Sequence, residues 1–306
     1  MALRLLTQMV TPRLKMDADR DLNTSFKLLL SNPSLEGMEE IFVIADRATA
    51  DFSKFIELLM NTELWKSLDY SNNALKDLCK GLSMHIQNHN QSLDWEPNYH
   101  SRSHFKDVCV ALSLLLQSQA VIANASAAHP APSISSAEAW ILLFCAIGHD
   151  CGHDGTINTS PFELEKKSIS QIHHWLSTTN YPLTEMNALM SYVEPIVLAT
   201  DPKNFQALLT KKIDQNHRTD LMALLMVEAD LMASILPVRG ALLSRNLAME
   251  WNQNYPAMAK LVNSTEGRIG FLERVQFTSP HSQVLNISAI QKTHIHQLKS
   301  NHVHSD

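Results

Sequence analysis

Residues 139–150 read Ala-Trp-Ile-Leu-Leu-Phe-Cys-Ala-Ile-Gly-His-Asp, an apolar run that ends in a histidine and an aspartate. Just before it, Ser135 and Glu138 stand at the spacing of a capping box at the start of a helix. A helix that is apolar on every side is buried on every side. The stretch therefore predicts a core helix, with His149 and Asp150 at its end.

The rest of the chain is also typical of a helical protein. It contains only 8 glycines and 12 prolines, and runs of alternating Val, Ile and Thr are few. We therefore expect an all-α fold, a compact arrangement of many helices, with a loop rich in Ala, Ser and Pro over 124–135. Helical spacing or composition predicts helices over residues 51–62, 73–88, 103–116, 139–148, 163–178, 184–199, 221–236 and 238–260.

The bulk composition excludes several classes of protein. Of the 306 residues, 45% are hydrophobic and 18% are charged, as in ordinary globular proteins, and the net charge of −6 argues against a general nucleic-acid binder. The 4 cysteines form no CxxC pair and are expected to be buried thiols, which indicates a reducing, cytoplasmic compartment. No apolar run approaches the roughly 20 residues that cross a bilayer. The basic start of the chain is compatible with a transit peptide but lacks the apolar stretch of a secretory signal.

Acidic residues stand where the apolar pattern predicts the core. Asp230 lies in the middle of the apolar stretch 221–236, and Asp150 directly follows the apolar helix over 139–148. An isolated carboxylate in an apolar interior is costly, so buried acids are paired, neutralised or bound to metal. A buried arginine or a capped helix would also explain one such acid. Two of them with histidines nearby favour metal.

The spacing of the histidines supports this interpretation. His100 and His104 are four residues apart, as are His149 and His153, so each pair could share one face of a helix if the backbone is helical there. One such pair alone is weak evidence. Imidazole with carboxylate suits zinc and other first-row metals, and added carboxylate and water ligands suit Mg²⁺ or Mn²⁺.

These motifs and their order along the chain resemble those of the catalytic domain of the class I 3′,5′-cyclic-nucleotide phosphodiesterases, within the HD superfamily. Tyr99–Val108 (YHSRSHFKDV) resembles the family motif YHNxxHAxDV, and His149–Asn158 (HDCGHDGTIN) fits HDxxHxGxxN at each specified position. Residues 199–201 match its ATD segment, residues 228–231 its xADL segment, and Gly270-Phe271 its GF pair. The matches span about residues 99–272. The resemblance implies an HD-type, all-helical phosphodiesterase fold.

The resemblance also implies a centre with two divalent metal ions. Zinc is expected at the tighter site, and Mg²⁺ or Mn²⁺ at a second, mostly hydrated site that Asp150 bridges. His153, Glu165 and Thr200 would surround the waters of that second metal. The expected ligands of the tighter metal are His104, His149, Asp150 and Asp230.

Roles in catalysis and recognition follow by position. The resemblance implies that His100 is the general acid and that Glu250 orients it, although that alignment needs a one-residue gap. A hydroxide that bridges the metals would attack phosphorus in line, and protonated His100 would protonate the departing alkoxide. Tyr99, Arg268 and Phe271 are expected to contact the substrate, with Phe271 stacking on a base.

Three positions depart from the family pattern. Arg268 replaces the glutamine that reads the purine, Ala233 replaces an asparagine, and Ser168 replaces a histidine of the ENHH run that begins at Glu165. Arginine only donates hydrogen bonds, so Arg268 could read guanine O6 and N7, grip an additional phosphate, or be a surface residue without a role in selectivity.

The expected function is therefore a metal-dependent hydrolase that cleaves 3′,5′-cyclic nucleotides to 5′-nucleoside monophosphates. Its partner would be a small nucleotide, with no nucleic acid and no membrane, and a homodimer is compatible with the sequence. The alternatives are an HD-type phosphohydrolase acting on a cyclic or linear dinucleotide or a nucleoside monophosphate, and a nucleotide-sensing binding module. Retention of His100 favours a diester because an alkoxide leaving group needs a positioned acid.

The expected domain organisation has three parts. Residues 1–90 would be an N-terminal helical region packed on the same domain, residues 91–290 the phosphodiesterase core, and residues 291–306 a flexible tail. This tail, frayed from about residue 290, carries four histidines that could bind metal weakly, but a solvated segment is favoured. These histidines are His294, His296, His302 and His304.

Overall fold

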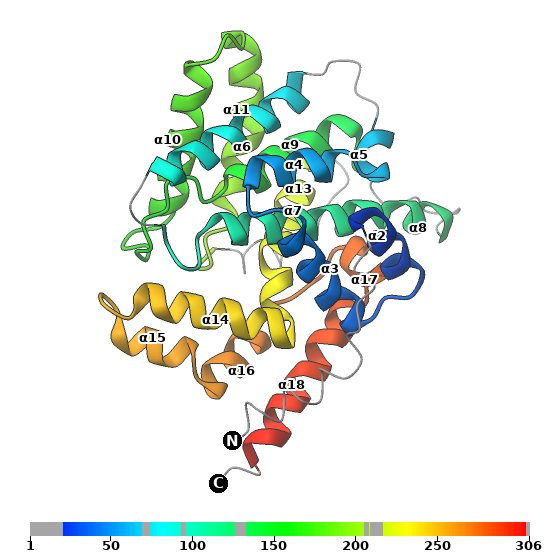
Figure 1. Ribbon diagram of the computed structural model, residues 1–306, viewed down its shortest axis with the longest axis vertical. Coiled ribbons are helices and arrows are strands. Elements are labelled where there is room, and N and C mark those ends of the chain that lie inside the picture. Colours follow the sequence, from blue (N-terminus) through cyan, green and yellow to red (C-terminus); the bar gives the residue numbers. More distant parts are fainter. Residues whose placement is uncertain are drawn as a thin grey trace.

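The computed structural model describes residues 21–68, 74–92, 96–125, 133–204, 208 and 217–303. Within these ranges the chain is helical and contains no strand, so the all-α prediction is confirmed (Figure 1). The helices are α2 (Leu22–Ser31), α3 (Leu35–Ala48), α4 (Phe52–Met60), α5 (Glu63–Ser67), α6 (Ala74–Ser92), α7 (Arg102–Gln117), α8 (Gln119–Ala125), α9 (Ser136–Gly148), α10 (Glu163–Ser177), α11 (Leu183–Leu198), α13 (Arg218–Met232), the 3-10 turn η1 (Ala233–Ile235), α14 (Pro237–Trp251), α15 (Pro256–Val262), α16 (Thr265–Arg274), α17 (Pro280–Val284) and α18 (Ile287–Val303).

Three buried helices, α7, α9 and α13, form the centre of the molecule and pack against one another. The predicted capping box is present, since Ser135 Oγ accepts from the Glu138 backbone N–H and Glu138 accepts from the Ser135 N–H. By length and composition the stretch Arg102–Ala123 passes a test for a membrane span, but 78% of its apolar window is buried inside the protein. The core helix of a soluble protein has the same properties.

The N-terminal helices pack onto this centre. Figure 1 shows α2, α3 and α4 beside α7, and α6 packs against α9 and α4. Their apolar residues, such as Phe42, Phe52 and Leu82, belong to the same buried cluster as those of α7 and α9. The basic start of the chain, on which the transit-peptide interpretation rests, lies outside the described residues.

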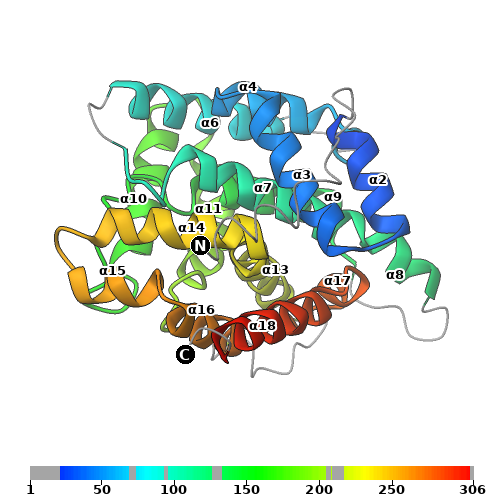
Figure 2. The same cartoon turned by 60° about the horizontal axis from the view of Figure 1, so that its bottom comes forward.

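The C-terminal third differs from the predicted pattern in two places. The helix predicted over 238–260 is two helices, because Pro256 cannot continue α14 and holds Tyr255 out of helical backbone angles. The prediction of a frayed tail is wrong for 291–303, which lie in α18 against α16 (Figure 2). His294 of α18 is buried, and its Nδ1 donates to the carbonyl oxygen of Ile235 at 2.8 Å. Packing on the core, which periodicity alone did not reveal, orders this helix; His304 lies outside the described residues.

A buried ion-pair network joins α14 to α7 and α3. The guanidinium of Arg239 donates to both carboxylate oxygens of Asp107, at 2.9 and 2.6 Å, and also binds Asp46. Glu39 of α3 accepts from the backbone N–H groups of Val238 and Arg239, which are otherwise free at the start of α14. These contacts fix the position of α14, which carries Glu250 at its far end.

All four cysteines are free and buried, as predicted. Burial raises the pKa of the Cys151 thiol to about 12, so this group is protonated at neutral pH.

Candidate metal centre

Four side chains from three helices converge beside the centre of the molecule. His104 lies in the first turn of α7, His149 and Asp150 directly follow α9, and Asp230 lies near the end of α13. His104 Nε2 is 3.0 Å from Asp230 Oδ1 and 3.7 Å from Asp150 Oδ2. His149 Nε2 is 3.1 Å from Asp150 Oδ2 and 3.6 Å from Asp230 Oδ1. The ligand atoms of His104, His149 and Asp230 all lie within 4.8 Å of one another, so these three could hold a single cation, and Asp150 lies against both imidazoles.

The protonation of His149 shows why this cluster suits a cation. Its Nδ1 lies 3.1 Å from the carbonyl oxygen of Ala146, which can only accept, so Nδ1 carries the proton in the neutral ring. The lone pair of Nε2 then faces the carboxylate of Asp150, and Nε2 has no hydrogen-bond partner. An acceptor facing an acceptor in a buried site requires a proton or a metal ion between them. The donor set of two imidazoles and two carboxylates suits zinc or another first-row divalent metal.

The pKa values of Asp230 and His149 are shifted by the same close contacts between carboxylates and imidazoles. Burial opposes the charge on Asp230, but hydrogen bonding to His104 and the charge of His149 hold its pKa at about 2. Burial also lowers the pKa of His149, and the charge of Asp150 outweighs that effect and raises it well above its ordinary value. Without a cation, therefore, the negative charges of Asp150 and Asp230 favour a proton on His149, and that positive charge in turn keeps the carboxylates ionised. A divalent ion takes over that role when it binds.

A second cluster lies beside the first and contains a histidine–carboxylate pair. His100 Nδ1 is 2.6 Å from Glu250 Oε1, and Glu250 Oε2 accepts from the backbone N–H groups of Tyr99 and His100. The carboxylate thus holds both the imidazole and the backbone of the loop before α7. Burial lowers the pKa of His100, but the hydrogen bond to Glu250 and the nearby acids raise it above its ordinary value. In the protonated ring Nδ1–H faces Glu250, and the second proton lies on Nε2, which Glu250 does not hold.

His153 stacks on His100 with the ring centroids 3.5 Å apart and the planes 18° apart. Its Nδ1 accepts from the backbone N–H of Gly155, and burial together with the charge of His100 lowers its pKa to about 4. His153 is therefore neutral at neutral pH. Gly155 has φ +75°, a conformation in which side chains are strained, and this explains the glycine at that position of the motif.

The two histidine pairs spaced four residues apart do not each lie within one helix, as a shared helix face would require. His100 precedes α7, and His153 lies in the turn after α9, so neither pair shares a helix face. The loops bring these histidines together instead. His100 and His104 have ring centroids 6.4 Å apart and nearly perpendicular planes.

The residues expected around a second metal lie on the α10 side of the site. Glu165 is buried in α10, and its carboxylate accepts from Asn158 Nδ2 at 3.0 Å. Burial and the charges of Asp201 and Asp150 raise the pKa of Glu165. Thr200 is buried, and its hydroxyl donates to the carbonyl oxygen of Val197. Its oxygen lone pairs are therefore available to a water or an ion.

Asp201 has a structural role that the sequence did not indicate. It is fully buried and accepts from the backbone N–H of Phe162 at 3.0 Å. Phe162 is the N-cap of α10 and has φ +62°, so Asp201 secures a strained turn that sets the start of α10. Through this turn it positions Glu165.

Two of the expected recognition residues, Arg268 and Phe271, lie in α16, and Arg268 contacts the start of α14. Arg268 is 92% buried, which excludes the interpretation of a surface residue. Its Nη2 donates to the carbonyl oxygen of Leu236 at 2.9 Å, and Nη2 would be only 1.9 Å from a Cβ at Gly240, so that position must be glycine. Arg268 Cζ lies 5.8 Å from the ring centroid of Phe271. One face of Phe271 is thus already approached by a cation.

Tyr99 connects this group to the metal cluster. Its ring centroid is 4.7 Å from that of His104, and its hydroxyl is 3.4 Å from Ser234 Oγ. Burial and the charge of Asp230 raise the pKa of Tyr99, so the phenol stays neutral. The Ala233 and Ser168 departures are both buried, and Ser168 Oγ donates to the carbonyl oxygen of Leu164.

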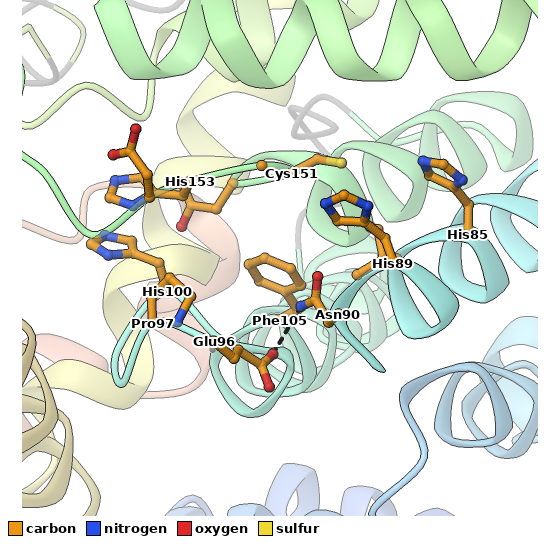
Figure 3. A pocket seen from close by; sticks show the side chains of 13 residues that line it. His85, His89, Asn90, Glu96, Pro97, His100, Phe105, Cys151 and His153 are labelled. Atoms are coloured by element: carbon orange, nitrogen blue, oxygen red, sulfur yellow. Dashed lines mark hydrogen bonds between the residues drawn. The ribbon is translucent and has the colours of Figure 1, made fainter. Parts of the chain in front are cut away.

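A pocket of about 160 Å³ opens beside the metal cluster on the side of α6 (Figure 3). It reaches from His100, Asp150 and His153 to the end of α6, and it includes residues that the sequence analysis did not single out. The i, i+4 spacing of His85 and His89 places both on one face of a helix and could have indicated them. Only the packing of α6 turns that face towards the site. The residues that were missed are His85, His89 and Asn90.

No protein-family model matches the chain, and a comparison with curated proteins finds no match.

Proposed function

We propose that the protein is a metal-dependent hydrolase of nucleotide phosphodiesters, with 3′,5′-cyclic nucleotides as the first substrate class to test. One observation carries this proposal. Four potential ligand atoms that face one another lie beside a histidine whose proton is supported by a buried carboxylate, Glu250. A metal cluster alone would suit many reactions, whereas an adjacent acid suits the departure of an alkoxide.

His104, His149, Asp150 and Asp230 would hold the tighter metal, and Glu165 with Thr200 and His153 would face the second. When bound, two divalent ions activate a water molecule near neutral pH and neutralise charge on the phosphate oxygens. His100 would act as the general acid and donate the proton on its Nε2 to the leaving oxygen. Glu250 keeps the ring oriented and protonated for that donation.

The pair of His100 and Glu250 suits phosphate esters with an alkoxide leaving group, which cyclic nucleotides, dinucleotides and nucleoside monophosphates all have. A poor leaving group gains most from a positioned acid. A binding module that only senses a nucleotide would need no such acid, so we expect turnover.

The test is a substrate panel with protein that has been stripped of metal and then supplied with Zn²⁺, Mn²⁺ or Mg²⁺. The panel contains bis(p-nitrophenyl) phosphate, cyclic AMP, cyclic GMP, linear and cyclic dinucleotides, and nucleoside monophosphates, with bound metal measured in parallel. We expect metal-dependent hydrolysis of diesters. Hydrolysis of the monophosphates alone, or no hydrolysis by protein that retains its metals, would overturn the proposal.

A further inference from the structure

The pocket beside the metal cluster extends away from the residues expected to recognise a base. Its inner end is formed by His100, His153 and Asp150, and its outer end by His85 and His89 of α6 (Figure 3). Tyr99, Arg268 and Phe271 do not line it. The metal cluster thus has two separate neighbours, the α16 side with Arg268 and the α6 side with this pocket.

The size and walls of the pocket suit one planar ring system. Its volume of about 160 Å³ is close to that of cavities that hold benzene, roughly 150 Å³. Phe105 and Pro97, both buried, form apolar parts of the wall. The rings of His85 and His89 stack with centroids 6.2 Å apart, and His85 also lies 6.2 Å from Trp175. Planar walls of this kind hold a base by stacking.

The acids at the pocket are already engaged. Glu96 accepts two hydrogen bonds from the Arg102 side chain and one from Asn90 Nδ2, and Asp154 is paired with Lys167 at 2.6 Å. These contacts leave no free carboxylate along the outer wall to repel a nucleotide. The polar groups still available there are the imidazoles of α6 and the carbonyl oxygen of the Asn90 amide, which can bond a sugar or a base edge.

The position of the acid decides which part of a substrate enters. Under the proposed function, His100 protonates the leaving oxygen, and His100 is itself part of the pocket wall. The group attached to the leaving oxygen therefore extends into the pocket. A 3′,5′-cyclic nucleotide has a single base, and the expected stacking on Phe271 would hold that base on the α16 side, so the pocket would remain empty.

We propose that this pocket holds the base of the leaving nucleoside of a linear diester, which makes 3′–5′-linked dinucleotides the preferred substrate class. The proposal rests on the proposed phosphodiesterase activity. The oxygen of water bonds to phosphorus, the bond from phosphorus to O3′ breaks, and O3′ takes the proton of His100 Nε2. The proton released by the water restores His100. The products are a 5′-phosphate on one nucleoside and a free 3′-hydroxyl on the other.

The test compares a linear adenylyl-adenosine dinucleotide with cyclic AMP in the wild type and in variants of the outer pocket. We expect kcat/KM for the dinucleotide to exceed that for cyclic AMP by about tenfold or more, the order of magnitude of one stacked base. The double variant His85→Ala/His89→Ala should lower this ratio about tenfold through KM, and His89→Trp should lower it by filling the pocket. His173→Ala is the matched control, because His173 is exposed on α10 and does not line the pocket.

Two different failures can be distinguished. Hydrolysis of bis(p-nitrophenyl) phosphate with an equal or higher preference for cyclic AMP, or with a ratio that the α6 variants leave unchanged, would overturn the pocket assignment alone. No hydrolysis of any diester by metal-loaded wild type would overturn the proposed function and the pocket assignment together. Thermal unfolding of each variant checks that the comparison is made between folded proteins.

Discussion

Two buried polar clusters lie along α7, only one turn apart, and they differ in whether they are complete. Around Asp107, the guanidinium of Arg239 supplies donors to both carboxylate oxygens and to Asp46, so charge and hydrogen bonds are satisfied within the chain. Around His104, lone pairs and carboxylates face one another, and the Nδ1 atom of His104 has no partner. The first cluster is therefore satisfied within the chain, whereas the second has ligand atoms that face one another as in a candidate metal site.

The two clusters differ in the arrangement of their hydrogen-bond acceptors and not in their burial. Burial of charge is common to both clusters, so burial alone does not identify function. What distinguishes the cluster around His104 is an excess of acceptors at distances suited to a shared cation. The predictions below test this difference, beginning with the largest expected effect.

Removal of one carboxylate from the incomplete cluster should abolish its function. Asp230→Ala is expected to eliminate retention of the tighter metal and to reduce diester hydrolysis below detection, while the fold persists because the smaller side chain removes a carboxylate without adding bulk or charge. Metal content by elemental analysis and initial rates measure the two effects. A variant that still holds two metals would show that Asp230 is not a ligand.

Removal of the acid should separate binding from chemistry. His100→Ala is expected to keep the metals and to lose about 10²–10⁴-fold in kcat for substrates with alkoxide leaving groups, the usual contribution of general acid catalysis. Esters of nitrophenol should lose much less, because that leaving group departs without a proton. If all substrates lose activity equally, His100 is not the acid.

Disruption of the complete cluster should affect stability first. Arg239→Met leaves the carboxylate of Asp107 buried and unpaired, and we expect the free energy of unfolding to fall by about 3–5 kcal/mol. Urea unfolding measures this loss. Arg218→Met is the control, since its pair with Glu138 is partly exposed, and there a loss of about 1 kcal/mol or less is expected. Equal losses in both variants would contradict the distinction.

The smallest expected effect concerns pH. Burial lowers the pKa of His100, while the hydrogen bond and charge of Glu250 raise it. Activity that needs the proton is present below this pKa and is lost as the pH rises through it. Glu250→Gln removes the charge, so the alkaline limb of kcat for an alkoxide-leaving substrate should move to lower pH. A limb that stays in place would mean that another group sets it.

The sequence predicted the helices well where apolar residues dominate. The run before His149 and the run around Asp230 are core helices, as expected, because an apolar surface on every side leaves a helix no exposed face. The tail was predicted poorly. The residues of α18 are polar on average, and its order depends on contacts of residues such as His294 and Gln291 with segments distant in the sequence.

Some residues of the candidate site could likewise be predicted from the sequence, and others could not. Local motifs indicated His104, His149, Asp150 and Asp230, since acids in apolar helices imply a partner whatever the packing. The stack of His153 on His100 and the inward face of His85 and His89 could not be inferred. They depend on a turn after α9 and on how α6 lies against α9, and neither is encoded in spacing along one helix.

The sequence by itself determined that this chain buries histidines and acids in a helical core, because the cost of burying charge is a local property of each residue. Only the tertiary structure decided which of those groups became a self-sufficient ion pair and which were left facing one another. That choice depends on distances of 3–4 Å between helices that are far apart in the chain. Such distances are set by the packing of the whole core, as is the pocket that α6 adds to one side of the site.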